Sequence, residues 1–246
     1  MAEAPNEPAA VDRTRDSAAT SPAERPTLAE DLLLLLFQPR SGTFAGETTL
    51  YYVLAAAVLA DLALEERVRA EATPTGTVRV GVVDGRAPSD EILRTTWDYL
   101  ADRPRFVQTV LPTIGPQLRQ PTVERLIARG DIGQESRRVL GLFGRKVLVS
   151  GENGRRAELV AAVRAVLVDG AQQGPRVAAL AALAWASGSL SQLDPEIPWT
   201  SVVTTRAQEL ERGSWAAAFG GEAVVRTMNA IIINSVIVAN AAIRRV

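Results

Sequence analysis

The chain has 246 residues, 47% of them hydrophobic, and a formal net charge of -1. That apolar content is enough to bury one substantial core. A net charge this close to zero argues against a general nucleic-acid-binding protein, which needs a basic excess to neutralise several phosphates. Any anion-binding site must therefore be a local patch of basic residues.

Cysteine and histidine are both absent from the chain. Their absence excludes disulfides, thiolate or imidazole metal ligands, and the Ser-His-Asp and Cys-His forms of catalysis. An enzyme would depend on carboxylates, Arg, Tyr or the single lysine, Lys146. We therefore expect a cytoplasmic protein that is not an enzyme and that holds neither a metal ion nor a cofactor.

The N-terminal stretch, residues 1–26, is polar and rich in Pro and Ala. It mixes acidic residues with Arg13, Arg15 and Arg25 and contains no apolar run. This composition is typical of a disordered tail and does not match a signal or transit peptide. Residues 27–246 are predicted to form one folded domain.

No later segment has the pattern of a transmembrane helix. The most apolar stretch, residues 230–243, is interrupted by Asn234, Ser235 and Asn240 and is shorter than the ~20 residues that a bilayer span requires. We therefore expect no part of the chain to cross a membrane.

The first half of the domain begins with two predicted helices. Thr27 and Glu30 have the spacing of a capping box, so a fully buried, leucine-rich helix should start near Leu28 and stop before Pro39. Residues 47–65 carry apolar side chains at helical spacing and should form the second helix.

A β-hairpin and a third helix come next. Residues 68–72 and 77–83 are short β-type runs separated by a Pro-Thr-Gly turn signal. Ser89 is the predicted cap of a helix with Leu93, Trp97 and other apolar residues on one face.

The middle of the chain contains several prolines, which we interpret as helix breaks. Pro104 should open a short helix that ends at Leu111, because Pro112 and Pro116 follow it. A separate helix is predicted over residues 122–129. A second β-hairpin should then form from residues 139–143 and 146–149.

The turn of that second hairpin is predicted at Gly144 and Arg145. Apolar stripes predict two helices on either side of Gly170 and Gly174, and the remainder of the chain, residues 200–210 and 215–243, continues as helix. The expected fold class is mainly α, a single helical domain around a central helix bundle with one or two short β-hairpins.

The second hairpin lies in a locally basic segment. From Arg119 to Lys146 the sequence has seven basic and three acidic residues, a local charge of +4. An apolar loop flanked by basic residues is the arrangement that an anionic membrane interface attracts. The predicted headgroup-binding residues are Arg119, Arg137, Arg138, Arg145 and Lys146. The residues predicted to insert into the bilayer are Leu140, Leu142 and Phe143.

Other interpretations of this segment stay open at the level of the residues. The apolar residues could form an ordinary strand against the core, since apolar side chains are usually inside. A helix followed by a basic hairpin is also what a winged-helix DNA-binding module would show, although Pro112, Pro116 and Pro121 crowd the region upstream. A scaffold that binds protein tails without any lipid role is the third interpretation.

Three segments resemble the Golgi phosphoprotein 3 family and occur in the family's order. They are LAEDLLLL at residues 28–35, LADLALEERV at residues 59–68 and RVAALAALAWAS at residues 176–187. The resemblance implies a helical domain that is peripheral at membranes, binds phosphatidylinositol 4-phosphate and dips a hydrophobic hairpin into the bilayer. The Arg-rich composition and reduced motif suggest a bacterial relative.

The resemblance also implies a place and partners for the chain. We expect it to associate with the inner face of a membrane, with anionic phospholipids as the partner and the oligomeric state left open. Eukaryotic members of the family additionally hold Golgi glycosyltransferases by their cytoplasmic tails, so tails of membrane proteins are a further expected partner. No nucleic-acid partner is expected.

The family's headgroup-binding residues are only partly present. When the chain is aligned to the family on the segment LADLALEERV, the family's headgroup-binding tryptophan and its first headgroup-binding arginine correspond to Gly46 and Ala55. Its later pair of arginines falls near Pro116 and Arg119, so only Arg119 is retained. The hairpin VLGLFG at residues 139–144 keeps the apolar tip that the family requires.

Overall fold

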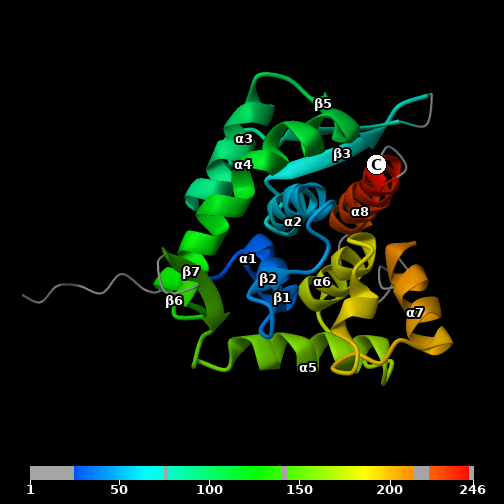
Figure 1. The fold of residues 1–246 in the computed structure, drawn as a ribbon. Coiled ribbons are helices and arrows are strands. Elements are labelled where there is room, and N and C mark those ends of the chain that lie inside the picture. Colours follow the sequence, from blue (N-terminus) through cyan, green and yellow to red (C-terminus); the bar gives the residue numbers. More distant parts are fainter. Residues whose placement is uncertain (1–24, 75–76, 140–142, 213–221, 244–246) are drawn as a thin grey trace, which may run out of the picture.

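The computed structural model describes residues 25–74, 77–139, 143–212 and 222–243. Over these residues the chain is mainly α-helical with short antiparallel strand pairs, which confirms the predicted fold class (Figure 1). The predicted tail, residues 1–26, lies outside the described residues except for Arg25 and Pro26.

Two buried helices form the centre of the domain. All eight residues of α1 (Leu28–Leu35) are buried, and the capping box between Thr27 and Glu30 is present as predicted. Helix α2 (Leu50–Leu64) is apolar around most of its circumference and packs on α1, α4, α6 and α8. Apolar residues on all sides require this central position, because no face of either helix is suited to water.

The later helices cover this centre, and they confirm the two helices predicted from apolar stripes and the helical structure predicted over residues 200–210 and 222–243. They are α5 (Arg155–Leu167), α6 (Pro175–Ala186), α7 (Ser201–Glu211) and α8 (Glu222–Ile243), with a short 3-10 helix, η1 (Leu190–Leu193), between α6 and α7. Trp215 lies outside the described residues. No helix of the described residues combines the length and the apolar character that crossing a bilayer demands.

A small antiparallel sheet contains the first predicted hairpin. Strands β3 (Val68–Ala72) and β4 (Val78–Val82) pair as expected, and β5 (Arg105–Phe106) adds to β4. The helix predicted from Pro104 is therefore wrong at its start, because the chain is extended there.

Helix α3 (Glu91–Ala101) is capped one residue later than predicted. Its N-cap is Asp90 and not Ser89, since Asp90 Oδ1 accepts hydrogen bonds from the backbone N–H groups of Ile92 and Leu93 at 2.8 and 3.1 Å. A carboxylate at this position also interacts favourably with the positive end of the helix dipole.

One helix replaces the two that the prolines predicted. Helix α4 (Val107–Ala128) continues through Pro112, Pro116 and Pro121. Proline has a helical φ, so it removes a single backbone hydrogen bond and crowds one carbonyl, at a cost of about 3 kcal/mol. Pro112 and Pro116 face solvent, where water can satisfy the carbonyl groups that they leave free.

Packing on the opposite face holds α4 together. Val110, Leu111, Ile114, Leu118 and other apolar residues of α4 are buried, and each contributes about 1.5–3 kcal/mol. A Cβ on Gly115 would lie 2.4 Å from the carbonyl oxygen of Tyr51, so α4 and α2 are in close backbone contact at this glycine.

Two further strand pairs complete the fold. Strands β1 (Phe37–Gln38) and β2 (Thr43–Phe44) form a short ribbon after α1. Strands β6 (Ile132–Val139) and β7 (Phe143–Ser150) form the second predicted hairpin, but residues 140–142 connect them, so the turn predicted at Gly144 and Arg145 is wrong. The strands are longer than predicted because the exposed polar residues Gln134, Glu135 and Ser136 of β6 also pair with β7.

Candidate functional site

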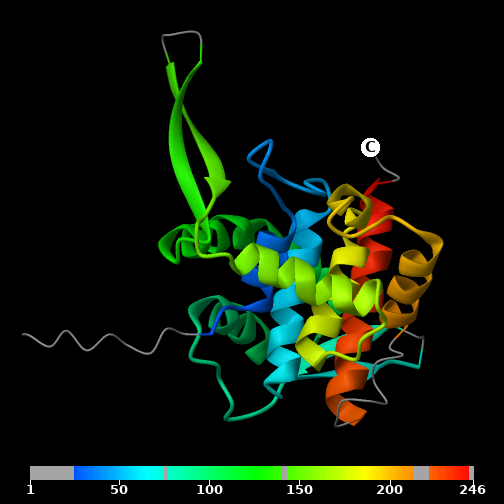
Figure 2. The ribbon, with the colours of Figure 1, turned by 90° about the horizontal axis from the view of Figure 1, so that it is seen from below.

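The β6–β7 hairpin projects from the helical body just beyond α4. Figure 2 shows it extending well clear of the surrounding helices. Ile132, the first residue of β6, is fully buried in the core, whereas Gln134, Glu135 and Ser136 are exposed. The backbone of the outer half of both strands therefore lies away from the body (Figure 2), while Leu148, near the end of β7, still packs against the core.

Asp131 anchors the root of this hairpin. Its carboxylate accepts a hydrogen bond from Asn153 Nδ2 at 2.6 Å and forms an ion pair with Arg155. The backbone N–H of Gly151 donates to the carbonyl oxygen of Asp131 at 3.0 Å. Only glycine fits at 151, since a Cβ would lie 1.9 Å from the carbonyl oxygen of Gly130. The two strands are thus closed tightly where they leave the body.

The β1–β2 ribbon supports the hairpin from one side. Gly42, between β1 and β2, has a φ of +69°. A Cβ at this position would lie 2.6 Å from the carbonyl oxygen of Leu148 and 2.9 Å from Cγ1 of Val147. The ribbon therefore contacts β7 closely enough to limit bending of the hairpin at its lower half.

The strand register brings four of the five predicted headgroup-binding residues together. Arg137 lies opposite Arg145, Arg138 lies opposite Gly144, and Lys146 lies opposite Ser136. We call Arg137, Arg138, Arg145 and Lys146 the basic half-hairpin. The side chain of Lys146 is exposed, and the side chains of the three arginines lie outside the described residues.

The residues predicted to enter the bilayer are adjacent to this basic half-hairpin. Leu140 and Leu142 lie outside the described residues, and Phe143 begins β7 opposite Val139. The backbone of these two strand ends is at the part of the hairpin most distant from the body (Figure 2).

Arg119, the fifth predicted residue, occupies a different place. It lies on α4 about two and a half turns before the end of the helix, which is roughly 14 Å along the axis. Its Nη2 donates to Glu47 Oε1 at 3.1 Å, and its guanidinium carbon is 5.4 Å from the centre of the Phe44 ring. Glu47 therefore competes with any anion for Arg119, a contact that the sequence alone does not reveal.

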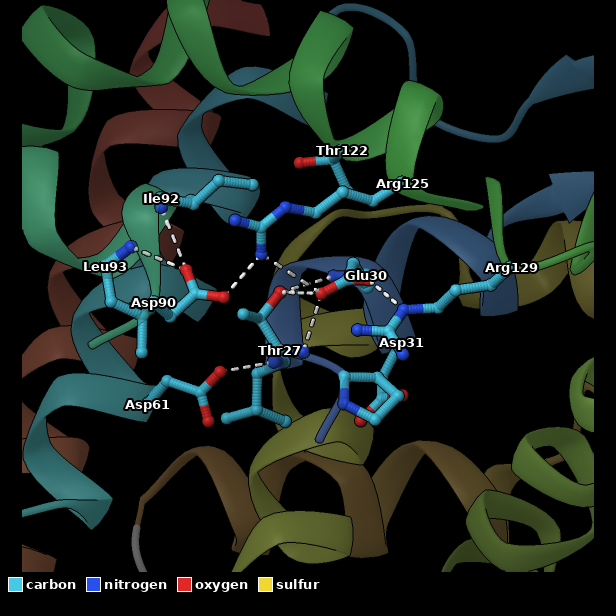
Figure 3. A network of polar contacts seen from close by, with 12 residues as sticks. Thr27, Glu30, Asp31, Asp61, Asp90, Ile92, Leu93, Thr122, Arg125 and Arg129 are labelled. Carbon is cyan, nitrogen blue, oxygen red and sulfur yellow. Dashed lines mark hydrogen bonds and ion pairs between the residues drawn. The ribbon is translucent and has the colours of Figure 1, made fainter. Parts of the chain in front are cut away.

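Two other basic residues of the segment have structural partners. Arg129 Nε donates to Glu30 Oε1 at 3.0 Å, and Arg125 Nη1 donates to Asp90 Oδ2 at 2.5 Å (Figure 3). Glu30 is fully buried, so the positive charges of Arg125 and Arg129 are needed to neutralise its carboxylate inside the protein. The local charge of +4 that the sequence shows is thus only partly available for an external ligand.

A second group of buried charges lies beside them. Arg176 donates to Asp61 Oδ1 at 2.6 Å and to Asp31 Oδ2 at 2.7 Å, and Asp61 accepts a short hydrogen bond from the backbone N–H of Leu28. Desolvation by burial raises the pKa of Asp61 to about 6, and the neighbouring Arg176 charge opposes this shift. Asp61 is a lone acid in an apolar helix, which is the sequence signal that could have indicated a buried ion pair.

The described residues contain no group of three or more acidic side chains placed to hold a metal ion. The arrangement is instead that of a rigidly rooted, basic projection on a helical body, which can present positive charge to a large anionic surface.

The fold and this projection define a mainly helical domain with one basic β-hairpin. The chain belongs to the Golgi phosphoprotein 3 (GPP34) family, whose model matches residues 28–231 and so confirms the resemblance seen in the sequence. Comparison with curated proteins gave no match.

Three of the four positions that the resemblance assigns to headgroup ligands carry no charged side chain. Gly46 has a φ of +72°, and a Cβ there would lie 2.2 Å from Ser189 Oγ, so a larger residue would strain the backbone and displace Ser189. Ala55 is fully buried in α2, and Pro116 is an exposed residue of α4. Of these four positions only Arg119 carries a charge, and it is paired with Glu47.

Proposed function

We propose that the protein is a peripheral membrane protein that binds anionic phospholipid headgroups through the basic half-hairpin. The observation that supports this most directly is the register, which gathers four basic residues on the outer half of a hairpin projecting from the body. Membership of the Golgi phosphoprotein 3 family supports the same function.

The charge distribution of the hairpin favours an anionic partner. Like charges directly opposite each other destabilise an antiparallel pair, and Arg137 lies opposite Arg145. A surface of phosphate groups would neutralise that repulsion. Each basic residue near such a surface contributes about 1 kcal/mol, so four contribute about 4 kcal/mol, or roughly a thousandfold in affinity.

Leu140, Leu142 and Phe143 would add hydrophobic burial to this attraction. Binding by charge alone is reversible and weakens as the salt concentration rises. Apolar side chains that enter the boundary between headgroups and acyl chains add free energy of binding in proportion to their buried area. The proposal therefore assigns retention on the membrane to both parts of the hairpin.

We propose that phosphatidylinositol 4-phosphate, the headgroup that the family resemblance implies, is one of the lipids that this protein binds. The protein would recognise this headgroup by its negative charge and not by a specific pocket. The positions of Gly46, Ala55 and Pro116 provide no converging donors, and a phosphate pocket needs several. Binding should accordingly follow the total negative charge of the bilayer, with little preference among headgroups at equal charge.

Co-sedimentation with vesicles tests this function. We expect retention of the full chain on phosphatidylserine or phosphatidylinositol 4-phosphate vesicles, little retention on neutral phosphatidylcholine, and loss with increasing salt. The double variant Arg145→Glu/Lys146→Glu should lose retention. Arg103→Glu, a change at a 73% exposed arginine near β5, should not.

Apolar insertion has its own matched pair of variants. Phe143→Asp should weaken retention strongly, whereas Val202→Asp, at a 54% exposed position on α7, should leave it unchanged. Gel retardation with duplex DNA runs beside these assays, because a winged-helix module would bind DNA and be insensitive to Phe143→Asp. If the protein bound neither vesicles nor DNA, the lipid-binding and the DNA-binding functions would both be rejected, and a scaffold that binds protein tails would be favoured.

A further inference from the structure

The outward face of α8 is apolar over most of the helix. Ile233 and Ile237, which lie one turn apart, are 38% and 50% exposed and are among the most exposed large hydrophobic side chains of the described residues. Ala230 is half-buried and Ala241 is exposed on the same side of the helix. We call these four residues the α8 stripe. A row of exposed apolar side chains of this kind indicates an interaction site.

No charge interrupts the stripe. Residues 227–243 contain neither an acidic nor a basic residue. The opposite side of α8 packs on α2, β3 and α6, where Met228, Ile231 and Ile232 are fully buried. A helix that is apolar on all sides is normally covered on all sides, yet no part of the chain that the structure describes covers the stripe. Its partner must be uncharged there, because a charged group would lose its hydration without gaining an ion pair.

The direction of α8 argues against the bilayer as that partner. In Figure 2 the helix runs in the direction in which the β6–β7 hairpin projects, and its C-terminal end lies on that side of the body. Figure 1, turned by 90°, shows both elements foreshortened. A bilayer that meets the outer end of the hairpin would therefore face the end of α8 and leave most of the stripe uncovered. The stripe points sideways, toward a neighbouring protein molecule.

A second copy of the chain has the surface that this face requires. If a two-fold axis parallel to α8 related the copies, Ile233 and Ile237 would each pack on their counterparts. The stripe residues recur at spacings of three and four, as in the seam between two parallel helices. Arg226, which is exposed one turn before Ala230, ends the stripe on the side away from the hairpin, where solvent screens its charge.

We propose that two copies of the chain pair through the α8 stripe with their α8 helices parallel. A two-fold axis along α8 leaves the direction of the hairpins unchanged, so both hairpins reach the same bilayer. The inference rests on the proposed lipid function for this shared orientation, whereas the apolar contact between the helices does not require lipid.

The area of the stripe determines how strong the pairing is. From Ala230 to Ala241 the helix rises about 17 Å and is about 10 Å wide, so the stripe covers on the order of 200 Å² in each copy. A stable complex buries about 800 Å² in each partner. The pair is therefore weak in solution and forms mainly where a membrane concentrates the protein. Two hairpins on one bilayer then bind with an avidity that a single hairpin lacks.

Sedimentation equilibrium of the full chain measures the pairing without lipid. Protein concentrations from about 1 μM to about 1 mM cover the range of a weak pair. We expect a monomer–dimer equilibrium for the wild type and a monomer for Ile233→Glu/Ile237→Glu, since carboxylates would face each other across the seam. The matched control, Val202→Glu/Thr205→Glu, adds the same two charges at exposed positions of α7 and should leave the equilibrium unchanged.

Single cysteines report the direction of the pairing, because the chain has none of its own. A disulfide requires Cα atoms within about 7 Å of each other. Ala230→Cys and Ala241→Cys should each form a homodimeric disulfide under mild oxidation, in concentrated solution and on phosphatidylserine vesicles. An antiparallel pair would join positions 230 and 241 only in a mixture of the two variants. Val202→Cys should give no disulfide.

Vesicle retention connects the pairing with the lipid function. We expect Ile233→Glu/Ile237→Glu to bind phosphatidylserine vesicles about tenfold more weakly than the charge-matched α7 variant, because it binds with one hairpin. The inference would be overturned by a wild type that stays monomeric and forms no disulfide at 230 or 241, or that forms only the mixed disulfide.

Two further outcomes separate this inference from the lipid function. If the wild type never paired but the double glutamate variant lost vesicle retention, the stripe would be a membrane contact and the pairing would be rejected. If both homodimeric disulfides formed in a protein that binds no vesicle, the pairing would be upheld and the lipid function rejected.

Discussion

Arg176 and Asp61 form a buried ion pair that joins helices α6 and α2. Arg176 Nη1 lies 2.6 Å from Asp61 Oδ1, and the two side chains are only 18% and 6% exposed. Burial dominates the titration of Asp61, because its pKa is raised from 3.8 to about 6 even with the arginine beside it. The ionised form of Asp61 is therefore costly in the folded protein at neutral pH.

This shift predicts that the contribution of Asp61 to stability decreases as the pH rises. Between the unfolded pKa of 3.8 and the folded pKa of about 6, the folded state binds the proton and the unfolded state does not. The free energy of unfolding should then fall by about 2 kcal/mol between about pH 4.5 and about pH 7 from this group.

Denaturant unfolding of the wild type and of Asp61→Asn at both pH values isolates the effect. The difference in free energy of unfolding between the two proteins should change by that amount, because asparagine at position 61 does not titrate. A pH-independent difference for Asp61→Asn would contradict the prediction.

Gly46 predicts a second measurable effect. Gly46→Ala places a side chain at a φ of +72° and 2.2 Å from Ser189 Oγ. The left-handed backbone costs about 1 kcal/mol and the overlap adds about 1–3 kcal/mol. We expect the midpoint of denaturant unfolding to fall accordingly.

Gly85→Ala is the matched control for that substitution. Gly85 has a φ of +69° with nothing within 4 Å of its would-be Cβ, so this variant should show the backbone cost alone. Equal losses for the two alanine variants would mean that the contact with Ser189 does not resist a side chain at position 46.

The elements that the sequence predicts well are those whose local and tertiary preferences agree. The capping box and continuous leucines of α1 define both its start and its burial, so the prediction is confirmed. In α4 the two preferences conflict, since the prolines disfavour the helix locally while Leu111, Ile114 and Leu118 bury against the core. Tertiary packing decides the outcome, and no local pattern reveals this.

The candidate site was predictable in its composition but not in its geometry. The basic residues of the hairpin are visible in the sequence, yet its register is not, because the exposed residues Gln134, Glu135 and Ser136 of β6 give no alternation of apolar and polar side chains to fix it. The partners of the other arginines are also hidden, because ion pairs such as Arg129–Glu30 and Arg119–Glu47 join residues distant in sequence. Sequence reasoning therefore overestimates the charge that is free to bind an anion.

Pro116 predicts a gain of stability on substitution. It is exposed in the middle of α4, where its ring removes the hydrogen bond to the carbonyl of Pro112. Pro116→Ala should restore that bond, and after the added entropy of the unfolded chain we expect about 1–2 kcal/mol of stabilisation. Thermal and denaturant unfolding both measure it.

Pro175 provides the control, because proline is favourable at the first position of a helix and Pro175 begins α6. Pro175→Ala should leave stability unchanged or lower it slightly. A loss of stability in Pro116→Ala would show that α4 depends on the rigidity of proline and would contradict the packing argument.

Arg155 links the folding of α1 to the hairpin. Its guanidinium pairs with the carboxylates of Asp31 and Asp131, which are 9% and 1% exposed. Arg155→Ala would leave both carboxylates without this cation, although Asp31 keeps Arg176 and Asp131 keeps Asn153. We expect a loss of about 3 kcal/mol in the free energy of unfolding.

The same substitution should loosen the root of the hairpin more than the rest of the domain. Amide hydrogen exchange should accelerate in the lower part of β6 and β7, while the amides of α2 change only with global stability. Arg94→Ala, which removes a solvent-exposed pair with Asp98 on α3, should cost less than about 1 kcal/mol and leave the hairpin unaffected. If Arg155→Ala altered exchange uniformly across the domain, the hairpin would owe its anchoring to Ile132 and the core contacts and not to the buried charges.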